Sequence, residues 1–394
     1  MHLEAARGIA SIIVIFHHFA LAFAPWLKGS FLEGGVKYTP LFALLNGQGA
    51  VMFFFVLSGF VLSYQFFCRP TANALERSVI KRIPRLMIPA SVTIFFGLFI
   101  LKALPANYVA AGQITSSDWL SGFASAEFPQ NFAPSILSAV KQCLFVFILP
   151  HNSYYNTNLW TMANEFYGSM IVFFLCAASR WLSRTGFLSL MATLSAVCVV
   201  AHAAFVPFIA GCSLAYYQSR GHRWRISRRA ISVTIVAVAT VCFSTERWYF
   251  QVAASVILML LLLGDDKVAK RLSGQIGSIL GSLSFPIYLV HTLVIVSISS
   301  SLFLWLHGQQ IAYSVMLVLT LIVTIVASVL LSLPLILLEK IWVPFLNSVI
   351  KKVSFPWTFP QNSCASAPPD EIASCAIPTT SRPIKPPSRR SSGA

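Results

Sequence analysis

Long apolar runs, separated by short polar or basic segments, occupy most of the first 350 residues of this chain. Several runs reach about 18–20 residues, the length that a helix needs to cross the hydrocarbon core of a bilayer. The pattern predicts an all-α integral membrane protein, built as a bundle of about ten transmembrane helices. The expected spans lie at about 5–24, 47–67, 86–104, 158–178, 186–203, 204–218, 229–245, 248–264, 282–304 and 312–338.

Two segments fall outside these spans. The apolar segment 134–150 is interrupted by Lys141 and Gln142, so we expect it to be re-entrant or interfacial and do not count it as a span. The segment 351–394 is basic and rich in Pro and Ser, a composition typical of disordered chains that rest on anionic lipid. The chain therefore divides into a membrane domain, 1–350, and a disordered cytoplasmic tail, 351–394.

Composition supports the membrane class. The chain is 57% hydrophobic and only 10% charged, whereas soluble globular domains carry about 25% charged residues. The basic residues behind its net charge of +16 lie mainly in the loops. The sequence shows no water-soluble basic face with interleaved aromatics, so nucleic-acid binding is not predicted. The eight cysteines form no CxxC pair, so neither a disulfide framework nor a metal site is predicted.

The distribution of basic residues predicts the orientation. With the N-terminus in the cytoplasm, the great majority of the 28 Lys and Arg residues fall on the cytoplasmic side. Short cytoplasmic loops carry such an excess of positive charge. We therefore expect an even number of spans with both termini cytoplasmic, in a multi-pass protein of the inner or plasma membrane.

Ionisable residues inside spans are functional candidates, because burying charge in lipid is costly. Arg7 and His18 are eleven positions apart in the first span. At about 100° per residue they lie on one helix face, separated by roughly 16 Å along the axis. A neutral imidazole at the depth of His18 could take a proton from an attacking hydroxyl. The alternative is that the histidine only bonds a neighbouring helix.

Two further candidates lie deep in other spans. Glu165 is the one acidic residue within the expected spans, at a depth similar to that of His18. A carboxylate there could orient the histidine and stabilise its protonated form; a structural pair with another helix is an equal alternative. His291, in SFPIYLVHT, could join the same polar cluster or bond a helix backbone. Ser58 could act there or serve helix packing.

A basic segment precedes the third expected span. Arg82 and Arg85, in KRIPRLMIP, are three positions apart and share a face if this segment is helical. Together with Arg7 they could form a cationic mouth for a phosphate-bearing donor. Plain positive-inside anchoring explains the same segment, and the loop alone does not decide between the two.

Five segments, taken in order, resemble the acyltransferase-3 family of integral membrane O-acyltransferases. They are LEAARGIASIIVIFHH, GAVMFFFVLSGFVLSY, KRIPRLMIP, LWTMANEF and FPIYLVH. The series covers residues 3–300, and any one segment alone is weak. The resemblance implies an acyl-CoA donor, commonly acetyl-CoA, a saccharide or lipid-linked acceptor and no permanently bound cofactor. It also implies catalytic roles for Arg7, His18 and Glu165, and substrate or donor binding by Ser58, Arg82, Arg85, Trp160 and His291.

Two other function classes remain open on the sequence alone. A proton-coupled transporter of an anionic or sugar-linked solute would use the same residues, but it predicts broken helices or inverted repeats, and we find neither. A non-catalytic scaffold would leave the alignment of Arg7 with His18 unexplained. The sequence therefore favours a membrane O-acyltransferase.

Overall fold

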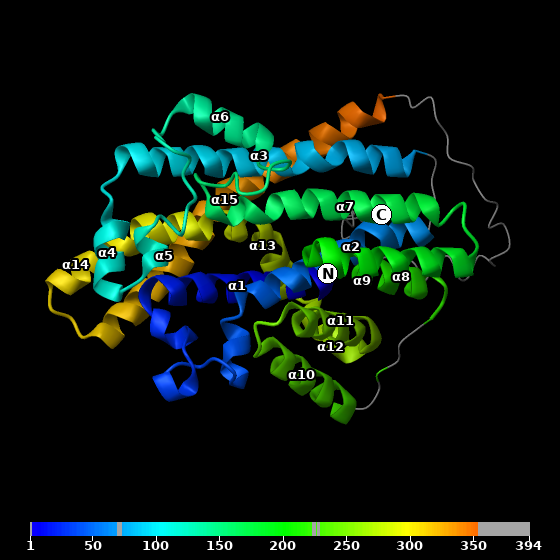
Figure 1. Ribbon diagram of the computed structural model, residues 1–394, viewed down its shortest axis with the longest axis horizontal. Helices are drawn as coiled ribbons and strands as arrows, with labels where there is room; N and C mark the ends of the chain where they lie inside the picture. Colours follow the sequence, from blue (N-terminus) through cyan, green and yellow to red (C-terminus); the bar gives the residue numbers. More distant parts are fainter. Residues whose placement is uncertain (1, 69–72, 223–225, 227–228, 354–394) are drawn as a thin grey trace, which may run out of the picture.

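The computed structural model describes residues 2–68, 73–222, 226 and 229–353, and all regular secondary structure in these ranges is helical (Figure 1). Seven helical segments are long and apolar enough to cross a membrane. They are α1 (His2–Phe23), α2 (Gly47–Cys68), α3 (Ala74–Ala103), α7 with its preceding turn (Thr157–Ala178), α8 (Arg184–Ala201), α13 to α14 (Gln275–Gly308) and α15 (Tyr313–Lys351).

The three remaining expected spans also form helices, but shorter ones. They are α9 (Val206–Ser219), α10 (Arg229–Phe243) and α11 (Trp248–Gly264), of 14, 15 and 17 residues. A helix of about 20 residues crosses the hydrocarbon core, so length alone supports seven spans. The other helices are α4 (Asn107–Thr115), α5 (Asp118–Ser121), α6 (Ile136–Phe145) and α12 (Asp266–Leu272).

Two helices extend beyond their expected spans. α3 begins at Ala74, so the basic segment KRIPRLMIP is part of a 30-residue helix and is not a loop. Its buried face already starts at Leu75 and continues through Arg82 and Leu86 at helical spacing. α15 continues to Lys351, which brings Glu339 into the helix. The predicted tail from residue 354 onward lies outside the described residues.

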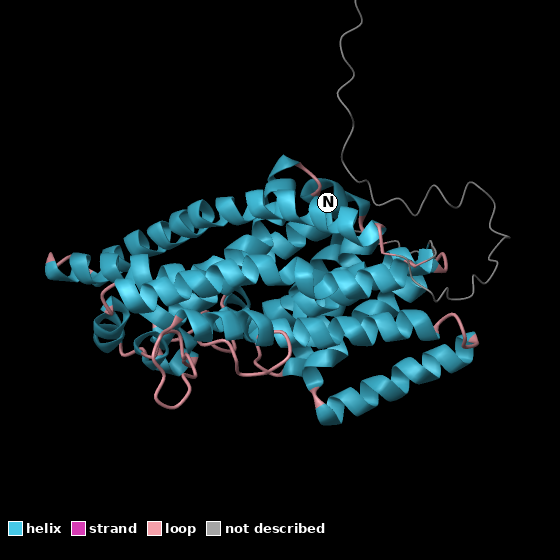
Figure 2. Cartoon of the chain, turned by 90° about the horizontal axis from the view of Figure 1, so that it is seen from above, coloured by secondary structure: helices cyan, strands magenta, loops and turns pink. Residues whose placement is uncertain are grey.

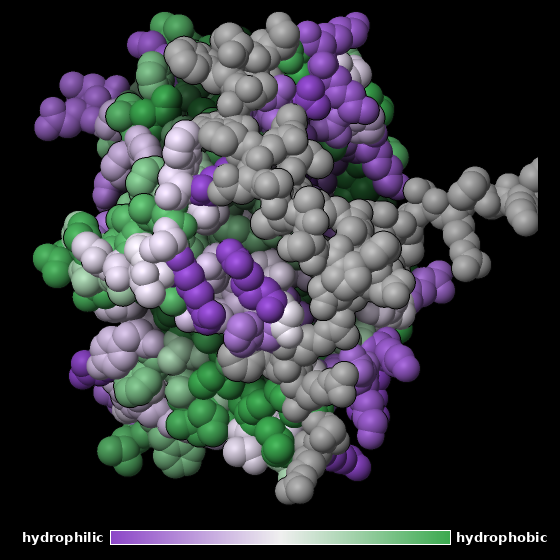
Figure 3. Space-filling model, turned by 90° about the vertical axis from the view of Figure 1, so that its right-hand side faces the viewer, coloured by the Kyte–Doolittle hydropathy of each residue, from purple (hydrophilic) through white to green (hydrophobic). Residues whose placement is uncertain are grey.

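α1 occupies the centre of the bundle, packed between α2 and α13 (Figure 1). α2 also packs against α7, α9 and α11, while α13 packs against α3 and α15. Figure 2 shows that short loops join most of these helices. α4, α5 and α14 gather at one end of the bundle (Figure 1). The other end faces the viewer in Figure 3, where hydrophilic and hydrophobic residues are intermixed.

Small residues allow α1 and α13 to approach closely. A Cβ at Gly8 would lie 2.5 Å from the carbonyl oxygen of Leu280, and one at Gly281 would lie 2.6 Å from the Cβ of Glu4. Ser11 Oγ donates a hydrogen bond to the Ser284 carbonyl across the same interface, at 3.0 Å. Close backbone approach through small residues is a common way for membrane helices to associate. It places the side chains of α1 directly against α13.

The turn between α11 and α12 provides a first test of the fold. Asp265 caps α12 by accepting the backbone N–H groups of Lys267 and Val268, and Ser232 of α10 donates to its other oxygen at 2.6 Å. These bonds, above all that from Ser232, hold the pKa of Asp265 below its ordinary value. We expect Asp265→Ala to destabilise the protein by about 1 kcal/mol. Thermal unfolding in detergent measures this.

The pH dependence of the stability lost in Asp265→Ala follows from the lowered pKa of Asp265. The ionised carboxylate stabilises the folded protein fully above the unfolded pKa, about 3.9. The contribution is lost as the pH falls through the lower folded value. The difference in unfolding free energy between wild type and Asp265→Ala should therefore be constant near neutral pH and should disappear in acid. Asp266→Ala, an exposed neighbour, is the control; an equal loss from both variants would contradict the cap.

Candidate functional site

α1 presents Arg7 and His18 to the same partner helix, α13. Arg7 donates from Nε to Ser284 Oγ at 2.8 Å and from Nη2 to the Gly281 carbonyl at 3.3 Å. His18 Nδ1 lies 2.8 Å from His291 Nε2. The shared face that the sequence predicts for Arg7 and His18 is confirmed. Nη1 of Arg7 has no hydrogen-bond partner among the described residues.

The hydrogen bonds of the two histidines determine where their protons lie. His291 Nδ1 is 3.1 Å from the Ile287 carbonyl, which can only accept, so this nitrogen carries the proton. His291 Nε2 is then the acceptor for the proton on His18 Nδ1. In this neutral form His18 Nε2 keeps its lone pair. It has no hydrogen-bond partner among the described residues, and the His18 side chain is partly exposed.

An aromatic ring covers His18. Trp119 of α5 stacks on the imidazole with ring centroids 5.2 Å apart and an interplanar angle of 16°. Its segment is fixed to the end of α1, because Thr115 donates to the Ala22 carbonyl and Ser117 to the Leu21 carbonyl. Sequence reasoning missed Trp119, because it lies in the long segment between α3 and α7 and only the fold brings it to α1.

A buried polar layer from α7 and the turn before it surrounds His291. The Asn158 amide lies 3.4 Å from His291 Nδ1 and donates to the Tyr288 carbonyl at 3.0 Å. Tyr288 donates its hydroxyl to the Asn158 carbonyl at 2.7 Å and lies 2.8 Å from Thr161 Oγ1. His291 itself is fully buried. This layer holds the ring of His291, and through it that of His18, in one orientation.

Glu165 has different partners from the one the sequence suggested. It forms an ion pair with Arg82 and accepts a hydrogen bond from Ser58 Oγ at 2.7 Å. Among the described residues, His18 bonds His291 and not Glu165. Of the two alternatives for Glu165, the pairing with His18 is wrong and the structural pair with another helix is confirmed, because α2 and α3 supply its partners.

Arg82 and Arg85 differ although they are neighbours on α3. Arg82 is buried, and its guanidinium bonds Glu165 and, from Nε at 2.8 Å, Ser169 Oγ. Arg85 is exposed. It is a charged neighbour of Arg7, as are the carboxylates of Glu4, Glu339 and Glu165. The predicted mouth therefore contains Arg7 and Arg85 with carboxylates beside them and is not purely cationic, while Arg82 is turned into the bundle.

Trp160 stands apart from the histidines. It begins α7 and is 46% exposed, and its side chain makes no hydrogen bond or ring contact among the described residues. Ser58, another predicted binding residue, bonds Glu165 as described. His17 bonds the segment before α2, with Nδ1 2.7 Å from the Leu45 carbonyl. Of the predicted site residues, the fold thus brings together His18 with His291, and Ser58 with Arg82 and Glu165, while Arg7 lies further along α1 against the same helix α13.

Comparison with known proteins adds to this geometry. A family model described as an acyltransferase domain matches residues 2–336. The O-acetyltransferase PaAT-1 of Phomopsis amygdali is 29% identical over 215 residues, which cover 46% of this chain and 41% of that protein. The aligned part thus spans about two fifths of the length of this relative. No solved structure matches the chain.

Proposed function

Because this chain belongs to the acyltransferase-3 family, with most of its length matched by the acyltransferase domain, we propose that it is a membrane O-acyltransferase. It transfers an acyl group, here taken as acetyl, from acyl-CoA to a hydroxyl of a saccharide or glycolipid acceptor. The observation that carries the proposal is the His18–His291 pair, which presents an unpartnered imidazole nitrogen inside the bundle.

The chemistry follows from the proton positions. His18 Nε2 accepts the proton of the acceptor hydroxyl as its oxygen attacks the thioester carbonyl carbon. The tetrahedral intermediate then breaks its C–S bond, and the coenzyme A thiolate takes the proton from His18. His291 Nε2 accepts the Nδ1–H of His18 throughout and stabilises the transient imidazolium. An acyl-histidine relay would use the same nitrogen; labelled acyl-enzyme in a rapid-quench experiment distinguishes it from direct transfer.

Arg7 and Arg85 mark the donor end of the site. We take the side of the bundle on which α1 begins as cytoplasmic, in the cell membrane. There the guanidinium groups bind the phosphates of acyl-CoA, with Arg7 held toward α13 by Ser284. Between Arg7 and His18, α1 packs against α13 through Gly8 and Ser11, so the thioester has to reach His18 by a route beside this interface. Arg82 contributes by positioning, because Glu165 and Ser169 occupy its guanidinium.

Replacing Arg7 tests this donor assignment. Arg7→Gln should raise the KM for acyl-CoA by roughly tenfold or more with a smaller effect on kcat. The reason is that the contact between arginine and phosphate is equally strong in the ground state and the transition state. Steady-state kinetics in purified membranes measure both constants. Arg271→Gln, which removes an exposed positive charge from α12, is the matched control. An equal rise in KM for both variants would show that the effect comes from general surface charge and would contradict the assignment of Arg7.

The activity itself is tested with labelled acetyl-CoA. Membranes that contain the protein should transfer label to a saccharide or glycolipid fraction, and membranes with the His18→Ala variant should not. Mass spectrometry of surface glycans with and without the gene identifies the acceptor. Solute uptake without any label transfer would instead support a transporter and overturn the proposal.

A further inference from the structure

His18 lies against a second histidine, His17, whose ring the proposed chemistry does not use. Their ring centroids are 5.1 Å apart at an interplanar angle of 71°, although consecutive helix residues point about 100° apart. His17 Nδ1 lies 2.7 Å from the Leu45 carbonyl, which can only accept, so this nitrogen carries the proton. No carboxylate bonds either ring within the described ranges, so nothing offsets the cost of a charge and both imidazoles are neutral. His17 Nε2 therefore keeps its lone pair, as His18 Nε2 does.

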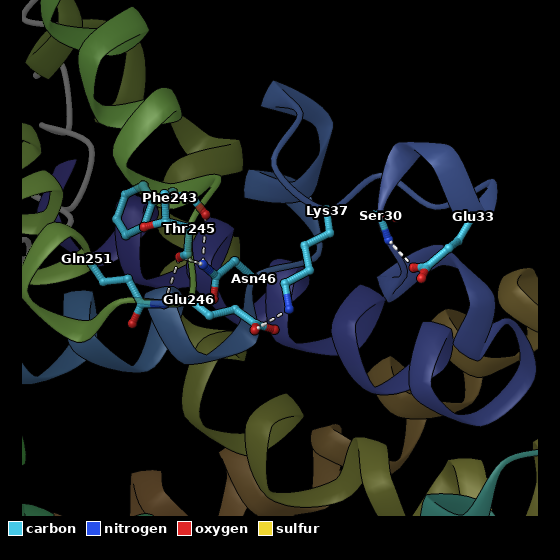
Figure 4. A network of polar contacts seen from close by, with 8 residues as sticks. All are labelled: Ser30, Glu33, Lys37, Asn46, Phe243, Thr245, Glu246 and Gln251. Carbon is cyan, nitrogen blue, oxygen red and sulfur yellow. Dashed lines mark hydrogen bonds and ion pairs between the residues drawn. The ribbon is translucent and has the colours of Figure 1, made fainter.

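The segment before α2 holds the ring of His17 in one place. A Cβ at Gly47, the first residue of α2, would lie 2.6 Å from His17 Cδ2, so the ring packs directly against the backbone there. Asn46 lies between Leu45 and Gly47 in the sequence. Its amide nitrogen donates to the Phe243 carbonyl at 2.7 Å, which ties this segment to the end of α10 (Figure 4). A ligand that bonds Nε2 thus finds the ring already ordered.

The Nε2 atoms of His17 and His18 are both open to a ligand. Both side chains are partly exposed, and neither Nε2 has a hydrogen-bond partner among the described residues or is closed off inside the protein. His291, the other histidine against His18, offers no free nitrogen, because its Nδ1 bonds the Ile287 carbonyl and its Nε2 bonds His18. Two accessible lone pairs therefore lie on neighbouring rings. One accepts the proton of the reacting hydroxyl, and the other has no role in that step.

The chemistry of the two reactants indicates which of them bonds His17. A lone pair binds only a hydrogen-bond donor. The reacting end of acetyl-CoA, which consists of the acetyl group and the sulfur, has no N–H or O–H group. A saccharide carries further hydroxyl groups on carbons beside the one that reacts. The donor phosphates do not compete for this nitrogen, because the arginine that binds them, Arg7, lies ten residues and roughly 15 Å away along α1.

We propose that His17 is an acceptor-positioning residue, whose Nε2 accepts a hydrogen bond from a second hydroxyl of the saccharide, on a carbon next to the one that is acylated at His18. This inference rests on the proposed acyltransferase function. The two hydrogen bonds together hold the reacting oxygen at His18 Nε2 in the orientation for attack. They also select acceptors with neighbouring hydroxyl groups over simple alcohols.

Two replacements of His17 separate acceptor binding from a purely structural role. His17→Asn keeps an N–H group for the Leu45 carbonyl but has no nitrogen in the place of Nε2, and His17→Ala loses both. Both variants should lower kcat/KM for the saccharide fraction roughly tenfold, as expected for one lost hydrogen bond. The KM for acetyl-CoA should change little. Transfer of label measures these constants, and thermal unfolding should detect a loss of stability in His17→Ala alone.

A structural residue gives a different result. If His17 only attaches the segment before α2 to α1, His17→Asn will match wild type in kcat/KM for the saccharide, and the proposal is overturned. An equal rise in the KM for acetyl-CoA would overturn it as well, because the lost contact would then belong to the donor. Wild type that transfers no label to any saccharide would refute the proposed function itself.

Deoxy sugars test the second hydroxyl directly. Methyl glucoside and its monodeoxy forms are added as competitors of the labelled saccharide fraction, and each deoxy form lacks one hydroxyl. Against wild type, at least one deoxy form should compete roughly tenfold less well than methyl glucoside. Against His17→Asn that same form and methyl glucoside should compete equally. Wild type that distinguishes none of the deoxy forms from methyl glucoside would overturn the proposal, as would a difference that persists in His17→Asn.

Discussion

His18→Ala is expected to abolish acyl transfer while leaving the protein folded and inserted. General acid–base catalysis by one side chain contributes about 10²–10⁴-fold to a rate, so we expect kcat to fall by about 10³-fold. His18 is partly exposed and makes one side-chain hydrogen bond, to His291, so its truncation should change stability little. Transfer from labelled acetyl-CoA and detergent gel filtration measure the two properties.

A second histidine variant makes this result specific. His202→Ala removes a histidine that bonds Asn164 on the far side of α7, and it should retain activity. Full activity of His18→Ala in membranes would refute the assigned role of His18. An equal loss of activity in both variants would show that replacing a histidine disturbs the bundle in general.

His291→Ala tests how His18 is held. Without His291, Nδ1 of His18 has no acceptor among the described residues, and the ring is free to rotate and to change tautomer. By analogy with other partners that orient a catalytic histidine, kcat should fall by about 10²-fold or more, with a small change in KM. The pH at which kcat is half-maximal should also move, which a purely structural residue would not cause. In the double variant the losses should not add.

The second large effect concerns stability. Glu165→Ala leaves the buried guanidinium of Arg82 without its carboxylate partner. Breaking a buried ion pair by removing one partner costs about 3–5 kcal/mol. We expect a marked loss of folded protein, seen as a lower melting temperature and lower yield in detergent. Because an uncompensated charge is the cause, Arg82→Met combined with Glu165→Leu should recover part of the lost stability.

The Lys37–Glu246 pair is the matched control for that prediction. It joins the loop before α2 to the α10–α11 turn and is partly exposed, with side-chain exposures of 25% and 42% (Figure 4). Exposed pairs contribute at most about 1 kcal/mol, so Lys37→Met should have a far smaller effect than Glu165→Ala. Should Glu165→Ala unfold no more easily than Lys37→Met, the Arg82–Glu165 pair would not be a structural element of the bundle.

Local sequence patterns were enough to predict the helices and the shared face of Arg7 and His18. Long apolar runs favour helix, and each expected span forms a helix in the structure, although α9, α10 and α11 are shorter than a bilayer-crossing helix. The eleven-residue spacing of Arg7 and His18 fixes their shared face, because a helix has one period. Boundaries were less accurate where buried residues continue past the apolar run, as they do at the start of α3.

Only the tertiary structure decided which side chains meet. His18 bonds a residue 273 positions away, and Trp119 covers it from a segment that has no apolar period of its own. Their positions along the spans predict similar depths for Glu165 and His18, yet the carboxylate pairs with Arg82. Depth along the membrane normal follows from one helix taken alone. A contact depends on which helices are neighbours and how they are rotated, and close approaches such as that of Gly8 to α13 determine this.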